Sequence, residues 1–229
     1  MTEREKILGR IREALTLSAP MPGKHHSPAA HSSVNGHAVA SASDWLPLVG
    51  EAFESQITTF RTCSTELKTD FQLFDSHEHL TSKLQEISRA ESWQQIASHG
   101  GNLALPAAES LGLPILRTDS PYDVVALEKC DVGITECDAL VAQTGSVLVT
   151  SRSAGGRALS VLPPHHVVIA RREQLLADLP SAFALLQKKY ASNYPSFISF
   201  ITGPSRTGDI ERILVLGAHG PKKLTVLCF

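Results

Sequence analysis

The sequence has no long hydrophobic run, no closely spaced cysteines and no excess of charge of either sign. No apolar stretch approaches the roughly 20 residues that a membrane-spanning helix needs. The first residues, MTEREKILGRIREAL, are charged throughout and are unlike a signal peptide, so we expect a cytoplasmic protein. With 21 basic and 23 acidic residues, the chain lacks the concentrated positive charge of a sequence-independent nucleic-acid binder.

Motifs that hold metals or redox cofactors are also missing. The four cysteines are scattered, without the C-x-x-C spacing of a zinc site or an iron–sulfur cluster. Free thiols in a reducing compartment are therefore expected. The chain contains no G-x-G-x-x-G dinucleotide motif, no Walker loop and no H-x-x-x-H pair. We accordingly predict no cofactor and no metal on this chain.

The chain divides by composition into three parts. Residues 1–16 predict an amphipathic helix, in which Thr2 and Glu5 match a capping box. This helix either packs on its own domain or serves as a docking arm for a partner. Residues 17–43 are rich in Ser, Ala, Pro, Gly and His, with few large apolar groups to offset the cost of ordering, which predicts a flexible linker.

Residues 45–229 alternate between helical and strand patterns, which predicts one α/β domain. The β-branched, continuously apolar strands suit a mainly parallel sheet covered on both faces, and so a three-layer sandwich. Helices are expected at 46–60, 79–90, 175–190 and 209–214. Strands are expected at 72–74, 103–105, 115–116, 122–127, 132–135, 146–150, 166–170, 197–202 and 224–228.

A first candidate for chemistry is the bend between the strands at 132–135 and 146–150. Gly145 permits positive φ, so that neighbouring amides can point into one concavity, and Thr144 and Ser146 add hydroxyl groups. We predict that these three residues bind a ligand. A tight turn that only joins two strands is the alternative.

A second candidate follows the strand at 197–202. A strand end that meets a helix N-terminus is the usual anion site of open α/β sheets. Arg206 can grip a carboxylate or phosphate through two parallel hydrogen bonds. We predict a site built from Gly203, Ser205, Arg206 and Thr207; the alternative is a capped turn in which Arg206 makes a structural salt bridge.

A third candidate is His219, which stands between small residues in Gly217-Ala-His-Gly-Pro-Lys222. It can donate to a substrate carboxylate or move a proton near neutral pH, or it can cap a turn.

The segment 152–166 adds a glycine pair at 155–156, typical of a flexible lip. Its adjacent His165 and His166 would face opposite sides of a strand, which argues against joint metal binding.

Three of these segments together resemble the LUD domain family. They are GITECDALVAQTGSVLV, GRALSVLPPHHVVIA and ITGPSRTGDIERILVLGAHGPKKL, in the family's order between residues 133 and 224. Gln143 and Ser146 stand where an acidic residue and a threonine are common in the family. The N-terminal helix is similar to that of the family's lactate utilization protein C branch.

The resemblance implies a fold similar to the NagB/RpiA/CoA-transferase-like proteins. It also implies a part in oxidising L-lactate to pyruvate together with partner proteins that carry iron–sulfur clusters. The chain would then be an accessory subunit that binds a small carboxylate or phosphate anion, or supports the complex. The alternative is a stand-alone transferase, hydrolase or isomerase acting on a phosphorylated or CoA-linked carboxylate, with Glu136 as base or nucleophile and Arg206 as clamp. Glu136 and His219 are the candidate catalytic residues.

The site hypothesis depends on one spatial condition. The bends at Gly145 and Arg206 have to converge at one rim of the sheet. The ligand, the oligomeric state and any catalysis by this chain stay open at the level of sequence.

Overall fold

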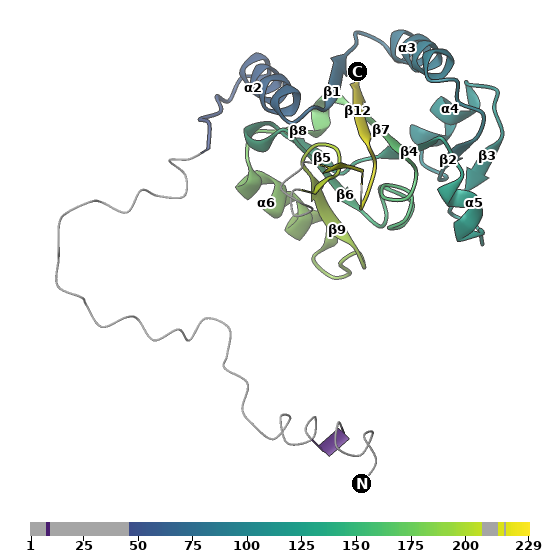
Figure 1. Cartoon of the computed structure of the whole chain (residues 1–229). Helices are drawn as coiled ribbons and strands as arrows, with labels where there is room; N and C mark the ends of the chain where they lie inside the picture. Colours follow the sequence, from purple (N-terminus) through teal and green to yellow (C-terminus); the bar gives the residue numbers. More distant parts are fainter. Residues whose placement is uncertain (1–7, 10–45, 208–214, 218) are drawn as a thin grey trace, which may run out of the picture. The chain divides into compact units, whose positions relative to one another are not determined.

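The apolar strand segments assemble into a six-stranded sheet in which every neighbouring pair is parallel (Figure 1). The strands are fully buried at its centre, as their continuous hydrophobicity predicts. The predicted α/β fold with a mainly parallel sheet is thus confirmed. The order across the sheet is β1 (Asp70–Leu73), β12 (Lys223–Cys228), β7 (His165–Ala170), β4 (Val132–Glu136), β2 (Ile96–Ser98) and β3 (Ile115–Arg117).

The computed structural model describes residues 8–9, 46–207, 215–217 and 219–229. The described residues from Leu46 onward belong to one compact unit. The predicted helix at 1–16, apart from Leu8 and Gly9, lies outside the described residues, as do the linker at 17–43 and the helix at 209–214. These three remain predictions. No helix among the described residues is long and apolar enough to cross a membrane.

One face of the six-stranded sheet is covered by α3 (His77–Ala90) and α4 (Ala104–Glu109). Ser76 starts α3 by accepting a hydrogen bond from the backbone N–H of His79. The predicted stripe of α3 then buries Leu80 and Leu84 against Ile134 of β4 and Ile169 of β7. This packing confirms the helix expected at 79–90.

The other face is covered by α2 (Phe53–Glu66) and by a second sheet, which the sequence pattern did not predict. Its order is β8 (Leu175–Leu176), β5 (Ala139–Val141), β6 (Ser146–Thr150) and β9 (Ile198–Ile201). The outer face of the second sheet is covered by α6 (Leu179–Tyr190). Asp178 caps α6 by accepting from the N–H of Ser181 at 2.9 Å.

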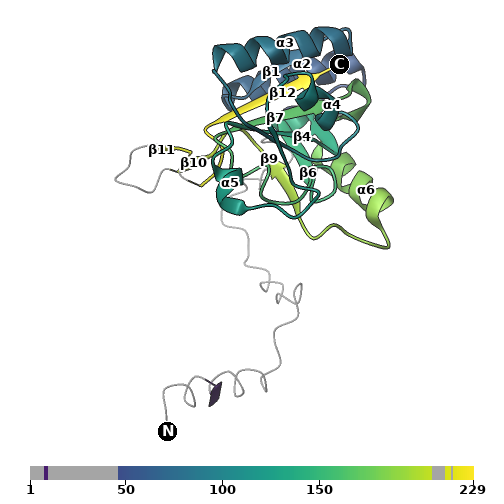
Figure 2. The same ribbon diagram turned by 90° about the vertical axis from the view of Figure 1, so that its right-hand side faces the viewer.

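The remaining described elements are short. α5 (Val124–Glu128) packs beside β2 and β3, with Leu127 buried. β10 (Arg206–Thr207) and β11 (Val215–Leu216) form an antiparallel pair that projects beyond the amino end of β12 (Figure 2). The 3-10 turns are η2 (Ala142–Thr144) and η3 (Arg172–Gln174).

Two predicted strands are wrong. The run at 103–105 opens α4, and the run at 122–127 becomes α5, whose cap Asp123 accepts from the N–H of Val125 at 3.0 Å. β2 (Ile96–Ser98) was not predicted at all. Short apolar runs do not show enough periods to separate helix from strand, which explains all three differences.

The adjacent histidines of β7 are both buried, and each bonds a threonine on a neighbouring strand. His165 Nε2 lies 2.9 Å from Thr225 Oγ1, and His166 Nε2 lies 2.8 Å from Thr135 Oγ1. Burial lowers the pKa of His165 to about 4 and that of His166 to about 3. Both rings are therefore neutral in the folded protein at physiological pH.

We expect the stability of the fold to fall as pH decreases from 6.5 towards 4. In that range the unfolded chain takes up protons on His165 and His166, whereas the folded chain does not. Each histidine contributes a slope of up to about 1.4 kcal/mol per pH unit. Guanidinium unfolding at several pH values should show a smaller slope for His166→Gln than for the unaltered chain. Equal slopes would contradict the assignment.

Candidate functional site

The candidate functional site lies at the carboxyl ends of β2 and β4. These strands are neighbours in the sheet. The chain leaves β2 towards α4 on one face, whereas it leaves β4 towards β5 of the second sheet on the other. Where connections diverge in this way, a crevice opens at the carboxyl ends of the strands, and ligands of open α/β sheets bind there. His99 follows β2 and Glu136 ends β4.

Glu136 is held in one orientation by the start of α4. Its Oε1 accepts from the backbone N–H of Leu103 at 2.6 Å and of Ala104 at 3.3 Å. A side chain at Gly101 would collide with this carboxylate and with the His99 ring. Glycine at position 101 therefore allows the carboxylate and the imidazole to approach each other closely.

His99 lies under the loop that follows β6. It is 5% exposed, and its Nε2 has no partner among the described residues. A Cβ on Gly155 would collide with it, and Thr118 Oγ1 donates to the Gly155 carbonyl at 2.9 Å, which fixes the loop in place. Burial lowers the pKa of His99, although the Glu136 and Asp119 carboxylates oppose the shift.

A buried ion pair stands on the other side of Glu136. Asp138 is fully buried, and its Oδ1 accepts from Lys189 Nζ and from the Tyr190 hydroxyl, each at 2.6 Å. Burial raises the pKa of Asp138, but these bonds together with those of Ser153 and Thr150 outweigh it and leave the pKa below its usual value. The carboxylate is therefore charged at neutral pH, and it positions Lys189 beside the crevice.

Arg152 separates two hollows at this edge. Its guanidinium donates to the Asn193 carbonyl at 3.0 Å and lies over the Tyr190 ring, 5.2 Å from the centroid. One hollow, of about 400 Å³, is lined by Glu136, Ser153, Gln174 and Lys189 besides Arg152. The other, of about 450 Å³, is lined by His99, Thr118, Asp119 and Gly155 besides Arg152.

The arrangement combines an anion-binding cation with groups that can move a proton. Arg152 can hold a carboxylate bidentately. Glu136 and neutral His99 can accept a proton from a bound hydroxyl. Among the residues that the structure describes, no group of three or more His, Cys, Asp or Glu side chains is placed to hold a metal ion.

The predicted bend at Thr144, Gly145 and Ser146 packs against α2. Gly145 has φ 62°, as expected, but an added Cβ would lie 2.6 Å from the backbone nitrogen of Ser64. Ser146 Oγ bonds Thr144 Oγ1 and Thr202 Oγ1, each at 2.8 Å. The Cα of Gly145 therefore lies against the backbone of α2, the Gly145 N–H donates to the Ala142 carbonyl, and none of the three residues lines either hollow.

The second predicted segment reaches the same helix. A Cβ on Gly203 would lie 2.7 Å from the carbonyl oxygen of Leu67, the residue that caps α2. Arg206 donates to that same carbonyl, and Ser205 N–H donates to the Pro221 carbonyl at 2.9 Å. The bends at Gly145 and Arg206 do converge, but on the carboxyl end of α2. Thr207 pairs with Val215 in the β10–β11 ladder.

The two candidate catalytic residues do not share a site. Glu136 ends β4, whereas His219 precedes the amino end of β12 in a sheet whose strands all run the same way. The two side chains therefore belong to opposite ends of the sheet. Binding by the predicted residues and catalysis by this pair stay predictions.

The sequence interpretation missed His99, Arg152 and Lys189. The position of His99 after a strand and before Gly100-Gly101 was a usable signal, but β2 itself was not recognised. Arg152 was noted only as part of a flexible lip. Lys189 meets Asp138 across 51 residues of sequence, a separation at which no spacing rule applies.

Comparison with known proteins agrees with the family resemblance seen in the sequence. The LUD domain model matches residues 30–228. "Lactate utilization protein C" of Anoxybacillus flavithermus is 32% identical over 148 residues, which cover 58% of this chain and 66% of that protein. The protein of the same name from Halalkalibacterium halodurans is 40% identical over 107 residues, 46% of each chain. The chain thus matches between about half and two thirds of the length of these relatives.

A longer match and a solved structure extend the comparison. "Lactate utilization protein C" of Geobacillus thermodenitrificans is 28% identical over 204 residues, which cover 80% of this chain and 81% of that protein. The crystal structure of a DUF162 family protein from Deinococcus radiodurans superimposes with a TM-score of 0.60 at 17% identity. It covers 78% of this chain and 99% of the other, which shows a common fold.

We expect Lys189→Met to destabilise the fold by on the order of 2 kcal/mol, because it leaves the buried Asp138 carboxylate without its cation. The loss should be smaller than for a wholly buried pair, since the Lys189 side chain is 49% exposed. The double variant Asp138→Asn/Lys189→Met should regain most of the lost stability, because it removes the unpaired charge. Guanidinium unfolding measures the free energy of unfolding of each variant. Lys188→Met, next along α6, is the matched control, and an equal loss there would refute the role of the pair.

Gly145 and Gly112 allow a second matched comparison. Both have positive φ, 62° and 65°, but only Gly145 faces another backbone, while Gly112 faces open space. Gly112→Ala should lower the free energy of unfolding by about 1 kcal/mol, because alanine is strained in the left-handed conformation. Gly145→Ala should lower the free energy of unfolding by about 2 kcal/mol more than Gly112→Ala does, because the added methyl group collides with the backbone of α2. Equal melting temperatures of the two variants would show that the bend does not pack tightly on α2.

Proposed function

The chain belongs to the LUD domain family, and on that premise we propose that it serves lactate utilization as an accessory subunit that binds a small carboxylate. The name "lactate utilization protein C", carried by several relatives, supports the metabolic part of this proposal. The crevice at the carboxyl ends of β2 and β4 supports the binding part.

The observation that carries the binding site is the position of Arg152 between the two hollows. Its guanidinium is exposed, and one of its five N–H groups is used by the Asn193 carbonyl. The remaining N–H groups can donate two parallel hydrogen bonds to the two oxygens of a lactate or pyruvate carboxylate. A lactate hydroxyl would then face Glu136 on one side or His99 on the other, and either group is able to accept its proton.

The accessory role follows from the chemistry of the reaction. Oxidation of lactate to pyruvate removes two electrons and two protons, so an electron acceptor is required. The described side chains at the crevice can hold an anion and accept a proton, and we assign electron transfer to partner proteins that carry iron–sulfur clusters. In this scheme the chain holds the carboxylate and positions it for the partner.

Arg152→Gln should weaken binding of L-lactate or pyruvate to the purified chain at least tenfold, because the charged, bidentate contact is lost while a polar side chain remains. Isothermal titration calorimetry measures the change. Arg89→Gln, an exposed arginine on α3 away from the crevice, should bind as the unaltered chain does. The site assignment fails if the two variants are equally impaired or equally competent.

A second function, independent catalysis on a CoA-linked carboxylate, is favoured by the fixed orientation of Glu136. Because two backbone amides hold Oε1, Oε2 is presented in one direction. Its attack on a thioester carbonyl would form a mixed anhydride and release the CoA thiolate. Thiol release by the purified chain, abolished in Glu136→Gln, would establish this function. Absence of release across short-chain acyl-CoA substrates would eliminate it.

A further inference from the structure

An exposed apolar surface lies where α6 packs against β9, outside the second sheet (Figure 1). Phe183 of α6 is 58% exposed, and Ile198 of β9 is 37% exposed. Phe183 packs beside the half-buried Phe200, with the ring centroids 5.5 Å apart. Ile198 and Phe200 stand two residues apart on one strand, so their side chains share one face of the sheet. We call these three residues the α6–β9 face.

The α6–β9 face reaches the crevice through Tyr190. The Tyr190 hydroxyl lies 3.4 Å from Oγ1 of Thr150, and Thr150 is the cross-strand neighbour of Ile198. The Tyr190 ring lies under the guanidinium of Arg152, the cation between the two hollows. That guanidinium also donates to the carbonyl of Asn193, in the loop between α6 and β9. A protein that covers this face therefore lies beside the mouth of the crevice.

The strand β9 forms one edge of the second sheet. The Ser151 N–H donates to the Phe197 carbonyl at 2.9 Å, so these two residues form a hydrogen-bonded pair. Because such pairs alternate along an antiparallel ladder, the backbone groups of Ile198 and Phe200 point away from β6. They form no hydrogen bond with any residue that the structure describes. An extended segment of another protein can add to such an edge as a further strand.

The charges beside this face are positive. The sequence contains no aspartate or glutamate from 179 to 207. Lys188 of α6 is exposed and, like Arg152, forms no ion pair within the described part of the chain. Lys189 pairs with Asp138, which is buried, and still exposes 49% of its own side chain. The surface from the crevice to the α6–β9 face therefore attracts an acidic partner.

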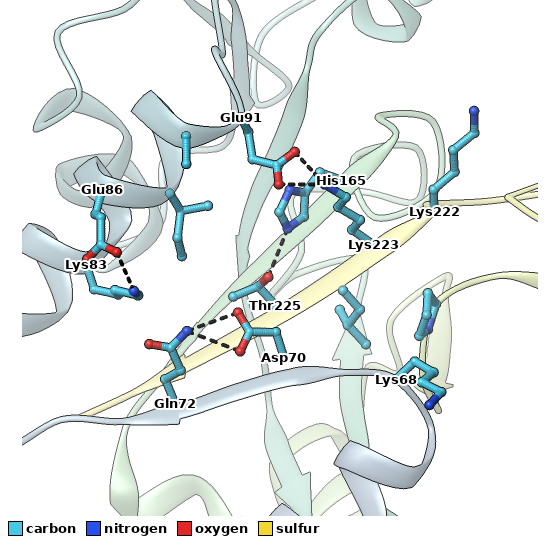
Figure 3. Close-up of a pocket in the computed structure, with 14 residues that line it drawn as sticks. Lys68, Asp70, Gln72, Lys83, Glu86, Glu91, His165, Lys222, Lys223 and Thr225 are labelled. Carbon is cyan, nitrogen blue, oxygen red and sulfur yellow. Dashed lines mark hydrogen bonds and ion pairs between the residues drawn. The ribbon is translucent and has the colours of Figure 1, made fainter.

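The opposite end of the sheet lacks such a surface. A cavity of about 430 Å³ lies there, and its lining includes the ion pairs Lys83–Glu86 and Lys223–Glu91 (Figure 3). None of the exposed large apolar side chains of the described residues lines this cavity. The α6–β9 face is distinguished by the combination of exposed apolar groups, an open strand edge and unpaired cations.

On the basis of the accessory role proposed above, we propose that the α6–β9 face docks an acidic, extended segment of the electron-accepting partner protein. The segment pairs with the outer edge of β9 and extends the second sheet. Phe183 and Ile198 supply the apolar contact, and Lys188 attracts the acidic side chains. Docking at this face places the partner next to the carboxylate that Arg152 holds, where the electrons of the reaction are released.

The test measures the Kd between the full chain and each purified iron–sulfur protein of the same lactate-utilization system, by calorimetry at two salt concentrations. Phe183→Ser and Lys188→Glu should each weaken binding roughly tenfold or more. Lys188→Glu should also reduce the salt dependence of the Kd. The matched controls are Val125→Ser on α5, where Val125 is 56% exposed, and Lys129→Glu, an exposed lysine just after α5. Both controls should bind as the unaltered chain does.

Amide hydrogen exchange followed by NMR distinguishes strand addition from other modes of docking. The N–H groups of Ile198 and Phe200 should exchange more slowly in the complex, because carbonyl groups of the partner accept from them. Phe183→Ser should leave L-lactate binding to the chain unchanged, so that docking and ligand binding are tested separately.

Each contrary outcome has a definite meaning. If neither iron–sulfur protein binds the unaltered chain, both this proposal and the accessory role are overturned. If one binds, but Phe183→Ser has no larger effect than Val125→Ser or the two amides keep their exchange rates, the docking surface alone is wrong. Self-association of the chain that is lost in Phe183→Ser would assign the face to a second copy and overturn the proposal as well.

Discussion

The divergence of the chain after two neighbouring parallel strands governs the rest of the structure. β2 and β4 end side by side, yet one continues into a helix on the first face and the other into a second sheet on the opposite face. The backbone cannot fill the space between two departing segments, so side chains line it instead. Glu136, His99 and Arg152 occupy that space, and Gly101 and Gly155 leave room for them.

Much of the central sheet could be predicted from the sequence because its strands obey a simple rule. β4, β7 and β12 are buried on both sides and are continuously apolar over several residues. The rule does not say which sheet a strand joins, so the second sheet was not predicted. It also fails for β2 and α5, which are too short to show a period.

The candidate site was only partly predictable. The bends at Gly145 and Gly203 and the Arg206 side chain come together, but they meet the carboxyl end of α2 and do not form the expected hollow at a rim of the sheet. What they meet is decided by α2, whose carboxyl end fills the space that a ligand would need. Conversely, the meeting of Lys189 with Asp138 and of His99 with Gly155 depends on the tertiary fold. Such contacts have no local signature.

The pairing of β1 with β12 has a consequence for how the chain is made. Asp70 lies opposite Thr225 and Leu73 opposite Cys228, so among the described strands β1 pairs only with β12, which lies far from it in the sequence. During synthesis β1 and α2 leave the ribosome long before β12 does. The edge of the sheet at β1 therefore forms only after β12 has been synthesised, which slows folding and leaves β12's place beside β1 unpaired until then.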